Sequence, residues 1–122
     1  MITSLERLDS LDESSTSAIE SERDFIRDTL EVLRGTGEIS NDAFLDAGTI
    51  QGGLSLLLSL ISQGISEDEA ISQLNSLKDR ANALESKYPG LDEKVEKIRK
   101  KYSSITPVIL YPYANARKHA QD

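Results

Sequence analysis

The fold is decided by the stretch from Ser66 to Ile105, SEDEAISQLNSLKDRANALESKYPGLDEKVEKIRKKYSSI. Its apolar or small residues recur at alternating steps of four and three, the heptad spacing that places side chains on one narrow stripe of an α-helix. Such a stripe is best buried against a second helix, from the same chain or from a second copy. The stripe consists of Ala70, Leu74, Leu77, Ala81, Leu84, Tyr88, Leu91, Val95, Ile98, Tyr102 and Ile105. Its larger members form the candidate interaction seam: Leu74, Leu77, Leu84, Tyr88, Leu91, Val95, Ile98 and Tyr102.

Pro89 and Gly90 interrupt this stretch. A proline lacks the backbone N–H and clashes with the preceding turn, and Pro-Gly is typical of turns. We therefore predict two helices that form an antiparallel hairpin over residues 66–104. The alternative is a single helix kinked at Pro89, because the four-three spacing continues across the proline without slipping.

Capping signals mark where three of the helices should begin. Ser66, with Glu69 three residues later, forms a capping box before the long helix of the hairpin. Asp92 is expected to cap the second helix of the hairpin, which would start at Glu93. Ser40, or the asparagine after it, should cap a helix in the middle of the chain.

The first 35 residues suit two helices. Apolar residues spaced by three predict an amphipathic helix of about three turns at the start. A serine-rich run at residues 14–17 interrupts it, and Ser17 with Glu20 makes a capping box, so a second helix is predicted from there to Gly35. One helix through the serines is the alternative, because serine is only mildly unfavourable in a helix. The expected inner faces carry Ile2, Leu5, Leu8 and Leu11, and then Ala18, Ile19, Phe25, Ile26, Leu30 and Leu33.

Three glycines lie close together at Gly48, Gly52 and Gly53. Each costs about 1 kcal/mol inside a soluble helix. We therefore predict a break between a short helix and an apolar helix over Leu54–Ser62. The alternative is that Gly48 and Gly52 form a flat patch that a second helix approaches closely.

The chain changes character at residue 105. Two prolines, several β-branched residues and two tyrosines in residues 105–113 exclude a regular helix and predict an extended segment. We therefore divide the chain into a helical domain, residues 1–104, and an extended C-terminal tail, residues 105–122. The tail is expected either to cover the core of the bundle or to dock into a groove or sheet edge of a partner. The candidate docking residues are Val108, Ile109, Leu110, Tyr111 and Tyr113.

The net charge of −7 is unevenly distributed. Residues 1–76 carry 4 basic and 15 acidic side chains, a net charge of −11, whereas residues 77–122 carry 10 and 6, a net charge of +4. We expect the two halves to pack side by side. In the alternative, residues 6–46 cover a basic partner, as in an immunity protein, an antitoxin or a nucleic-acid mimic. Direct binding of nucleic acid is unexpected, because Glu93 and Glu96 dilute the basic cluster at residues 94–101.

The composition offers little material for catalysis. There is no cysteine and one histidine, His119, so zinc-thiolate sites and Glu-x-x-His di-metal sites lack ligands. We assign no catalytic residue, metal or cofactor, and expect that the protein is not an enzyme. The apolar run Leu54–Ile61 is shorter than the roughly 20 residues of a membrane span, so no span is expected. A cytoplasmic location follows as the default expectation.

These patterns together predict an all-α helical bundle built on an antiparallel helical hairpin with a coiled-coil-like heptad seam. The expected function is protein–protein interaction or assembly, with self-association into a homo-oligomer as the preferred form. An acidic inhibitor of a basic partner is the alternative.

Overall fold

The computed structural model describes residues 1–8 and 15–105, and within these ranges the fold is all-α. No strand occurs among the described residues. The candidate docking tail, Val108 to Tyr113, lies outside them, so its two alternatives stay open. The helices are α1 (Ile2–Glu6), α2 (Thr16–Gly35), α3 (Asn41–Ser62), α4 (Glu67–Lys87) and α5 (Leu91–Ile105).

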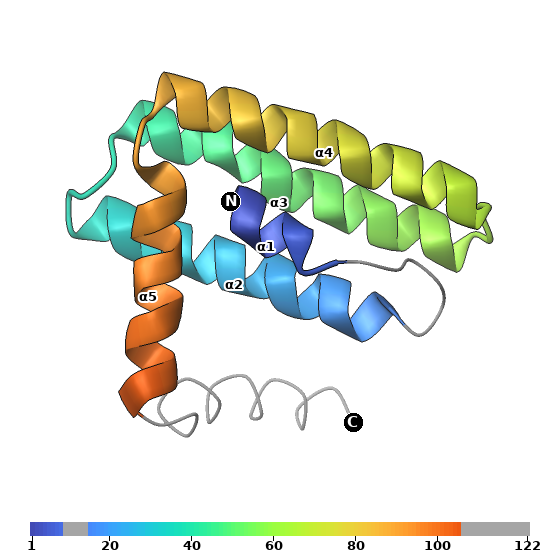
Figure 1. Ribbon diagram of the computed structural model, residues 1–122, viewed down its shortest axis with the longest axis horizontal. Helices are drawn as coiled ribbons and strands as arrows, with labels where there is room; N and C mark the ends of the chain where they lie inside the picture. Colours follow the sequence, from blue (N-terminus) through green and yellow to red (C-terminus); the bar gives the residue numbers. More distant parts are fainter. Residues whose placement is uncertain (9–14, 106–122) are drawn as a thin grey trace.

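Three long helices form the body of the molecule (Figure 1). Short connections join α2 to α3 and α3 to α4, so consecutive helices run antiparallel, and α3 lies between the other two. The short α1 packs against α4, α2 and α5. The helix α5 crosses one end of this layer at a steep angle and packs against α2 and α1.

A single core joins all five helices. Its buried side chains come from the apolar positions that recur every three or four residues along each helix. They include Leu5 of α1, Ile26 and Leu30 of α2, Ile50 and Leu54 of α3, Leu74 and Leu77 of α4, and Val95 of α5.

The predicted break at Pro89 and Gly90 is confirmed, because α4 ends at Lys87 and α5 begins at Leu91. Gly90 has a φ of 89°, a left-handed conformation that suits a residue without a side chain. The antiparallel hairpin is not confirmed, since α5 turns away across the bundle instead of returning along α4 (Figure 1). This turn lets the apolar face of α5 cover α1 and α2.

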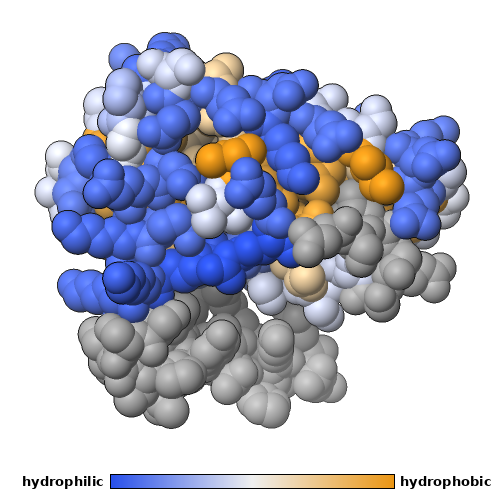
Figure 2. Space-filling view, in the orientation of Figure 1, coloured by the Kyte–Doolittle hydropathy of each residue, from blue (hydrophilic) through white to orange (hydrophobic). Residues whose placement is uncertain are grey.

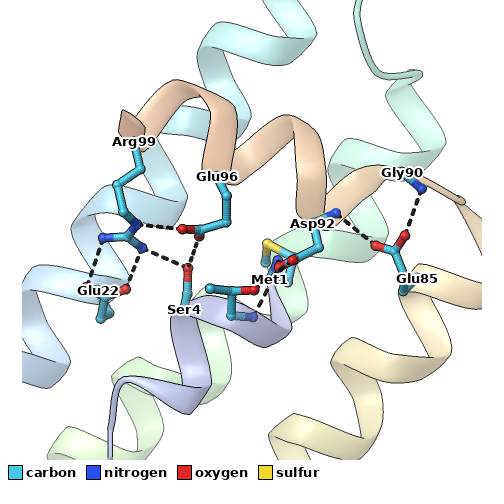
Figure 3. Close-up of polar contacts among 9 residues, drawn as sticks. Met1, Ser4, Glu22, Glu85, Gly90, Asp92, Glu96 and Arg99 are labelled. Atoms are coloured by element: carbon cyan, nitrogen blue, oxygen red, sulfur yellow. Dashed lines mark hydrogen bonds and ion pairs between the residues drawn. The ribbon is translucent and has the colours of Figure 1, made fainter. Parts of the chain in front are cut away.

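The start of α5 differs from the expected one by two residues. Asp92 lies inside the first turn and does not cap it. The carboxylate of Glu85, on α4, accepts hydrogen bonds from the backbone N–H of Gly90 at 2.7 Å and of Asp92 at 2.8 Å (Figure 3). A side chain of the preceding helix therefore satisfies N–H groups at the start of α5.

The described part of residues 1–35 forms two helices, as predicted, but their ends differ from the prediction. The first, α1, is a five-residue helix instead of three turns. The second, α2, begins at Thr16, so Ser17 lies inside it and caps nothing, and Ala18 is exposed. It ends at Gly35, as expected.

The predicted break at the three glycines is wrong, because α3 is one helix from Asn41 to Ser62. Its N-cap is Ser40, whose hydroxyl accepts a hydrogen bond from the backbone N–H of Ala43 at 3.0 Å. Packing of α3 between two neighbours offsets the weak helix propensity of glycine. At 22 residues this helix is, by length and composition, the one described helix that could cross a membrane, so shortness no longer argues against a span.

Candidate functional site

Most of the predicted interaction seam is enclosed by the chain itself. Leu74, Leu77, Leu84, Leu91 and Val95 are buried. Tyr88, Ile98 and Tyr102 are half-buried. The α4 part of the stripe faces α3 and α1, so the partner helices that the heptad spacing demanded belong to the same chain.

A second stripe with heptad spacing runs along the outside of α3. It consists of Leu45, Thr49, Gly52, Leu56 and Ser59, separated by steps of four, three, four and three, and we call it the outer stripe. All five residues are exposed. They lie on the side of α3 opposite the buried residues of that helix, since the two sets differ by about half a turn.

The outer stripe exposes large apolar side chains in an uncharged band. Leu45 is 60% exposed and Leu56 is 56% exposed, the two highest values among the large apolar residues that the structure describes. No charged residue occurs between Asp46 and Glu67 in a protein with 29% charged residues. This band therefore differs from the rest of the surface.

Glycines leave part of the middle of this helix face without side chains. Apart from the adjoining residues and the local helix backbone, no atom of the described residues lies within 4 Å of a Cβ built on Gly48 or Gly52. Gly53 differs, because a Cβ there would overlap Cδ2 of Leu77. The close approach foreseen for Gly48 and Gly52 thus occurs at Gly53, between α3 and α4, while the other two glycines face outward.

A shallow hollow of about 300 Å³ borders the outer stripe, between α2 and α3. Its floor and walls are formed by Arg27, Leu30, Glu31, Phe44, Leu45, Gly48 and Gln51. The guanidinium of Arg34 stacks on the ring of Phe44, 4.4 Å from its centroid. The hollow is thus mainly apolar, with charged side chains on its α2 side.

Figure 2 shows one face of the molecule. Hydrophilic residues cover most of its described surface, and apolar residues emerge only in separate small patches. Scattered apolar residues of this kind are normal for a monomer surface and need no partner.

The buried polar groups of the molecule join helices to one another (Figure 3). Arg99 of α5 donates to both carboxylate oxygens of Glu22 on α2, at 2.6 and 3.2 Å, and to the carboxylate of Glu96 at 3.0 Å. It also donates to Oγ of Ser4 at 3.0 Å and stacks on Phe25 at 3.9 Å. These contacts fix α5 against α1 and α2, so we read them as structural.

Some residues of the basic cluster of α5 form hydrogen bonds and ion pairs within the chain. The guanidinium of Arg99 is paired with carboxylates, and Lys94 donates to the backbone carbonyl of Glu38 at 2.6 Å. Lys97 and Lys100 remain exposed. Lys101 also has an interaction within the chain. Direct binding of nucleic acid therefore gains no support from this geometry.

A further set of polar contacts joins the C-terminal end of α4 to α3. Asp46 accepts hydrogen bonds from Nζ of Lys87 at 2.8 Å and from the hydroxyl of Tyr88 at 2.6 Å. These bonds lower the pKa of Asp46 and raise the pKa of Lys87 and of Tyr88. Among the described residues no group of three or more His, Cys, Asp or Glu side chains is arranged to hold a metal ion.

Comparison with protein-family models, curated proteins and solved structures finds no match for this chain. The functional argument therefore depends on the surface itself. The outer stripe was not predicted from the sequence, because the predicted break at the glycines divided α3 in two. The signal was present, since Leu45, Gly52 and Leu56 already have heptad spacing.

Proposed function

We propose that this protein is a non-enzymatic helical assembly protein that associates with itself through the outer stripe of α3. The observation that carries the proposal is the exposure of Leu45 and Leu56 on a glycine-containing helix face that has no charged residue of α3 after Asp46. Burying a leucine side chain contributes roughly 1.5 to 3 kcal/mol, so four leucines in a two-fold interface give a substantial driving force. The coiled-coil-like pairing expected from the sequence is thereby moved from α4 to α3.

Charge favours a second copy over a basic partner at this surface. Copies of a molecule with a net charge of −7 repel one another, and least where the touching surfaces carry no charge, as on α3 after Asp46. The alternative, an acidic inhibitor, needs free acidic side chains within residues 6–46. Several of these already face arginines: Asp24 lies 3.2 Å from Arg23 and 3.3 Å from Arg27, and Glu22 is bound by Arg99.

The test is the mass of the full chain in solution over a hundredfold range of concentration, by sedimentation or light scattering. We expect the average mass of the wild type to rise with concentration. Leu56→Asp should remain a folded monomer at every concentration, because a carboxylate would be desolvated in the interface. Val32→Asp is the matched control, since Val32 is 41% exposed on α2, away from the outer stripe.

A wild type that stays monomeric over the whole range would contradict the proposal. The acidic inhibitor would then become the preferred function. Its association with a basic partner should slow as salt rises, because screening weakens electrostatic steering.

A further inference from the structure

The geometry of α3 points to a specific pairing, which rests on the proposed self-association. We propose that two copies pair antiparallel about a two-fold axis beside Gly52, so that Leu56 of each copy enters a hole on the other. The occupant of the outer stripe is therefore a second copy of this chain. Spacing, shape and charge each support this arrangement.

The spacing is symmetric about Gly52. In an antiparallel pair centred there, positions at equal separations before and after Gly52 meet across the interface. Four residues away, Gly48 meets Leu56, about 6 Å from the axis along the helix. Seven residues away, Leu45 meets Ser59, roughly 10 Å from the axis. Each large side chain thus meets a small one on the other copy.

The shape of the outer stripe supplies the hole for Leu56. Leu45, Gly48, Thr49 and Gly52 occupy positions i, i+3, i+4 and i+7, the four positions that surround a knob in coiled-coil packing. The two glycines leave this hole open, because no described atom beyond the adjoining residues and the local helix backbone lies within 4 Å of their built Cβ positions. The hollow of about 300 Å³ adjoins it through Leu45 and Gly48.

Charge distinguishes antiparallel from parallel pairing. Beside the C-terminal end of α3, the first turn of α4 carries Glu67, Asp68 and Glu69, all exposed. Beside the N-terminal end lie Arg34 and Lys87, the latter paired with Asp46, and Asp42 lies there too. An antiparallel pair brings the acidic end of one copy to this end of the other, where cations and carboxylates are balanced. A parallel pair would instead place the three acidic residues of both copies together.

Disulfide cross-linking tests the orientation, because the chain contains no cysteine of its own. The variants are Leu45→Cys and Ser59→Cys, each oxidised alone and as an equimolar mixture, with Leu56 intact in both. A disulfide requires Cα atoms within about 7 Å. In the antiparallel pair, equivalent Ser59 residues lie roughly 21 Å apart along the helix. We expect a dimer of doubled mass from the mixture only, reversed by reductant.

Each other outcome overturns the inference. Cross-links within each single variant would show parallel pairing and leave the self-association intact. No cross-link in the mixture, with a wild type that still associates, would place the interface on another face. No cross-link and a monomeric wild type would remove both proposals. Binding of that monomer to phosphatidylcholine vesicles, or its dimerisation after removal of residues 106–122, would then identify a bilayer or the tail as the occupant.

Discussion

The carboxylate of Asp92 accepts several hydrogen bonds from residues that are distant in the sequence. Its Oδ1 accepts from the N-terminal ammonium of Met1 at 2.5 Å and from the backbone N–H of Thr3 at 3.1 Å, and its Oδ2 accepts from the Thr3 hydroxyl at 2.7 Å (Figure 3). Burial alone would raise the pKa of Asp92, but these hydrogen bonds outweigh burial and lower it. The charged form therefore holds α1 against α5.

The lowered pKa of Asp92 predicts a stability contribution that acid removes. A carboxyl group with a lower pKa in the folded state stabilises the fold above its ordinary pKa, near 3.9, and loses this effect as pH falls through the folded pKa. Asp92→Asn should lower the free energy of unfolding by about 1 to 3 kcal/mol at pH 7. The difference from the wild type should shrink below about pH 4. Urea unfolding at pH 7, 5 and 3 measures it.

The exposed neighbour Glu93 provides the control for this experiment. Glu93→Gln removes the same charge from the same turn of α5, and it should change the free energy of unfolding little. If Asp92→Asn and Glu93→Gln behave alike at all three pH values, the ionic bond between α1 and α5 contributes nothing to stability.

At the scale of the helix, Gly53 sets how closely α3 and α4 approach. A Cβ at this position would overlap a methyl group of Leu77, so Gly53→Ala forces that side chain to shift. Overpacking of this kind costs typically about 1 to 3 kcal/mol, against a gain of roughly 0.5 to 1 kcal/mol from replacing glycine in a helix. We expect Gly53→Ala to lower the melting temperature of the dilute protein.

Gly52→Ala is the matched control, because it lies one residue away and meets no described atom. At a concentration too low for association it should raise stability by roughly 0.5 to 1 kcal/mol, the helix-propensity gain alone. Equal effects of the two substitutions in thermal unfolding would mean that Leu77 does not press on Gly53.

The ends of the helices and the continuity of α3 show how much of this fold the sequence can predict. Two helix ends marked by neighbouring residues were predicted well, since Ser66 accepts the N–H of Glu69 at 3.1 Å and Gly35 ends α2, whereas the cap expected at Ser17 was wrong. The continuity of α3 was missed, because a local cost of about 1 kcal/mol per glycine was weighed without the packing of α2 and α4 around it. The cap of α5 was missed because its acceptor, Glu85, belongs to another helix.

At the scale of the whole molecule, a heptad stripe predicts that its residues are buried, but it does not indicate which helix covers them. The stripe on α4 looked like an interface between copies, yet the chain supplies the neighbours itself, from α3 and α1. The stripe on α3 has heptad spacing in the sequence, but the sequence does not tell which side of that helix the core occupies. A candidate surface of this kind depends on what remains uncovered after folding, and local patterns do not contain that information.

Replacement of a leucine by aspartate should have different effects in the stripe on α4 and in the outer stripe of α3. Leu77, 7% exposed, packs on Gly53 inside one chain, so Leu77→Asp buries a charge without a partner. It should lower stability by several kcal/mol and unfold the protein at every concentration. Leu56→Asp should leave the dilute protein as stable as the wild type and abolish only the rise of its melting temperature with concentration. Thermal unfolding by circular dichroism over a hundredfold dilution distinguishes them; a folded, monomeric Leu77→Asp would return the interface to α4.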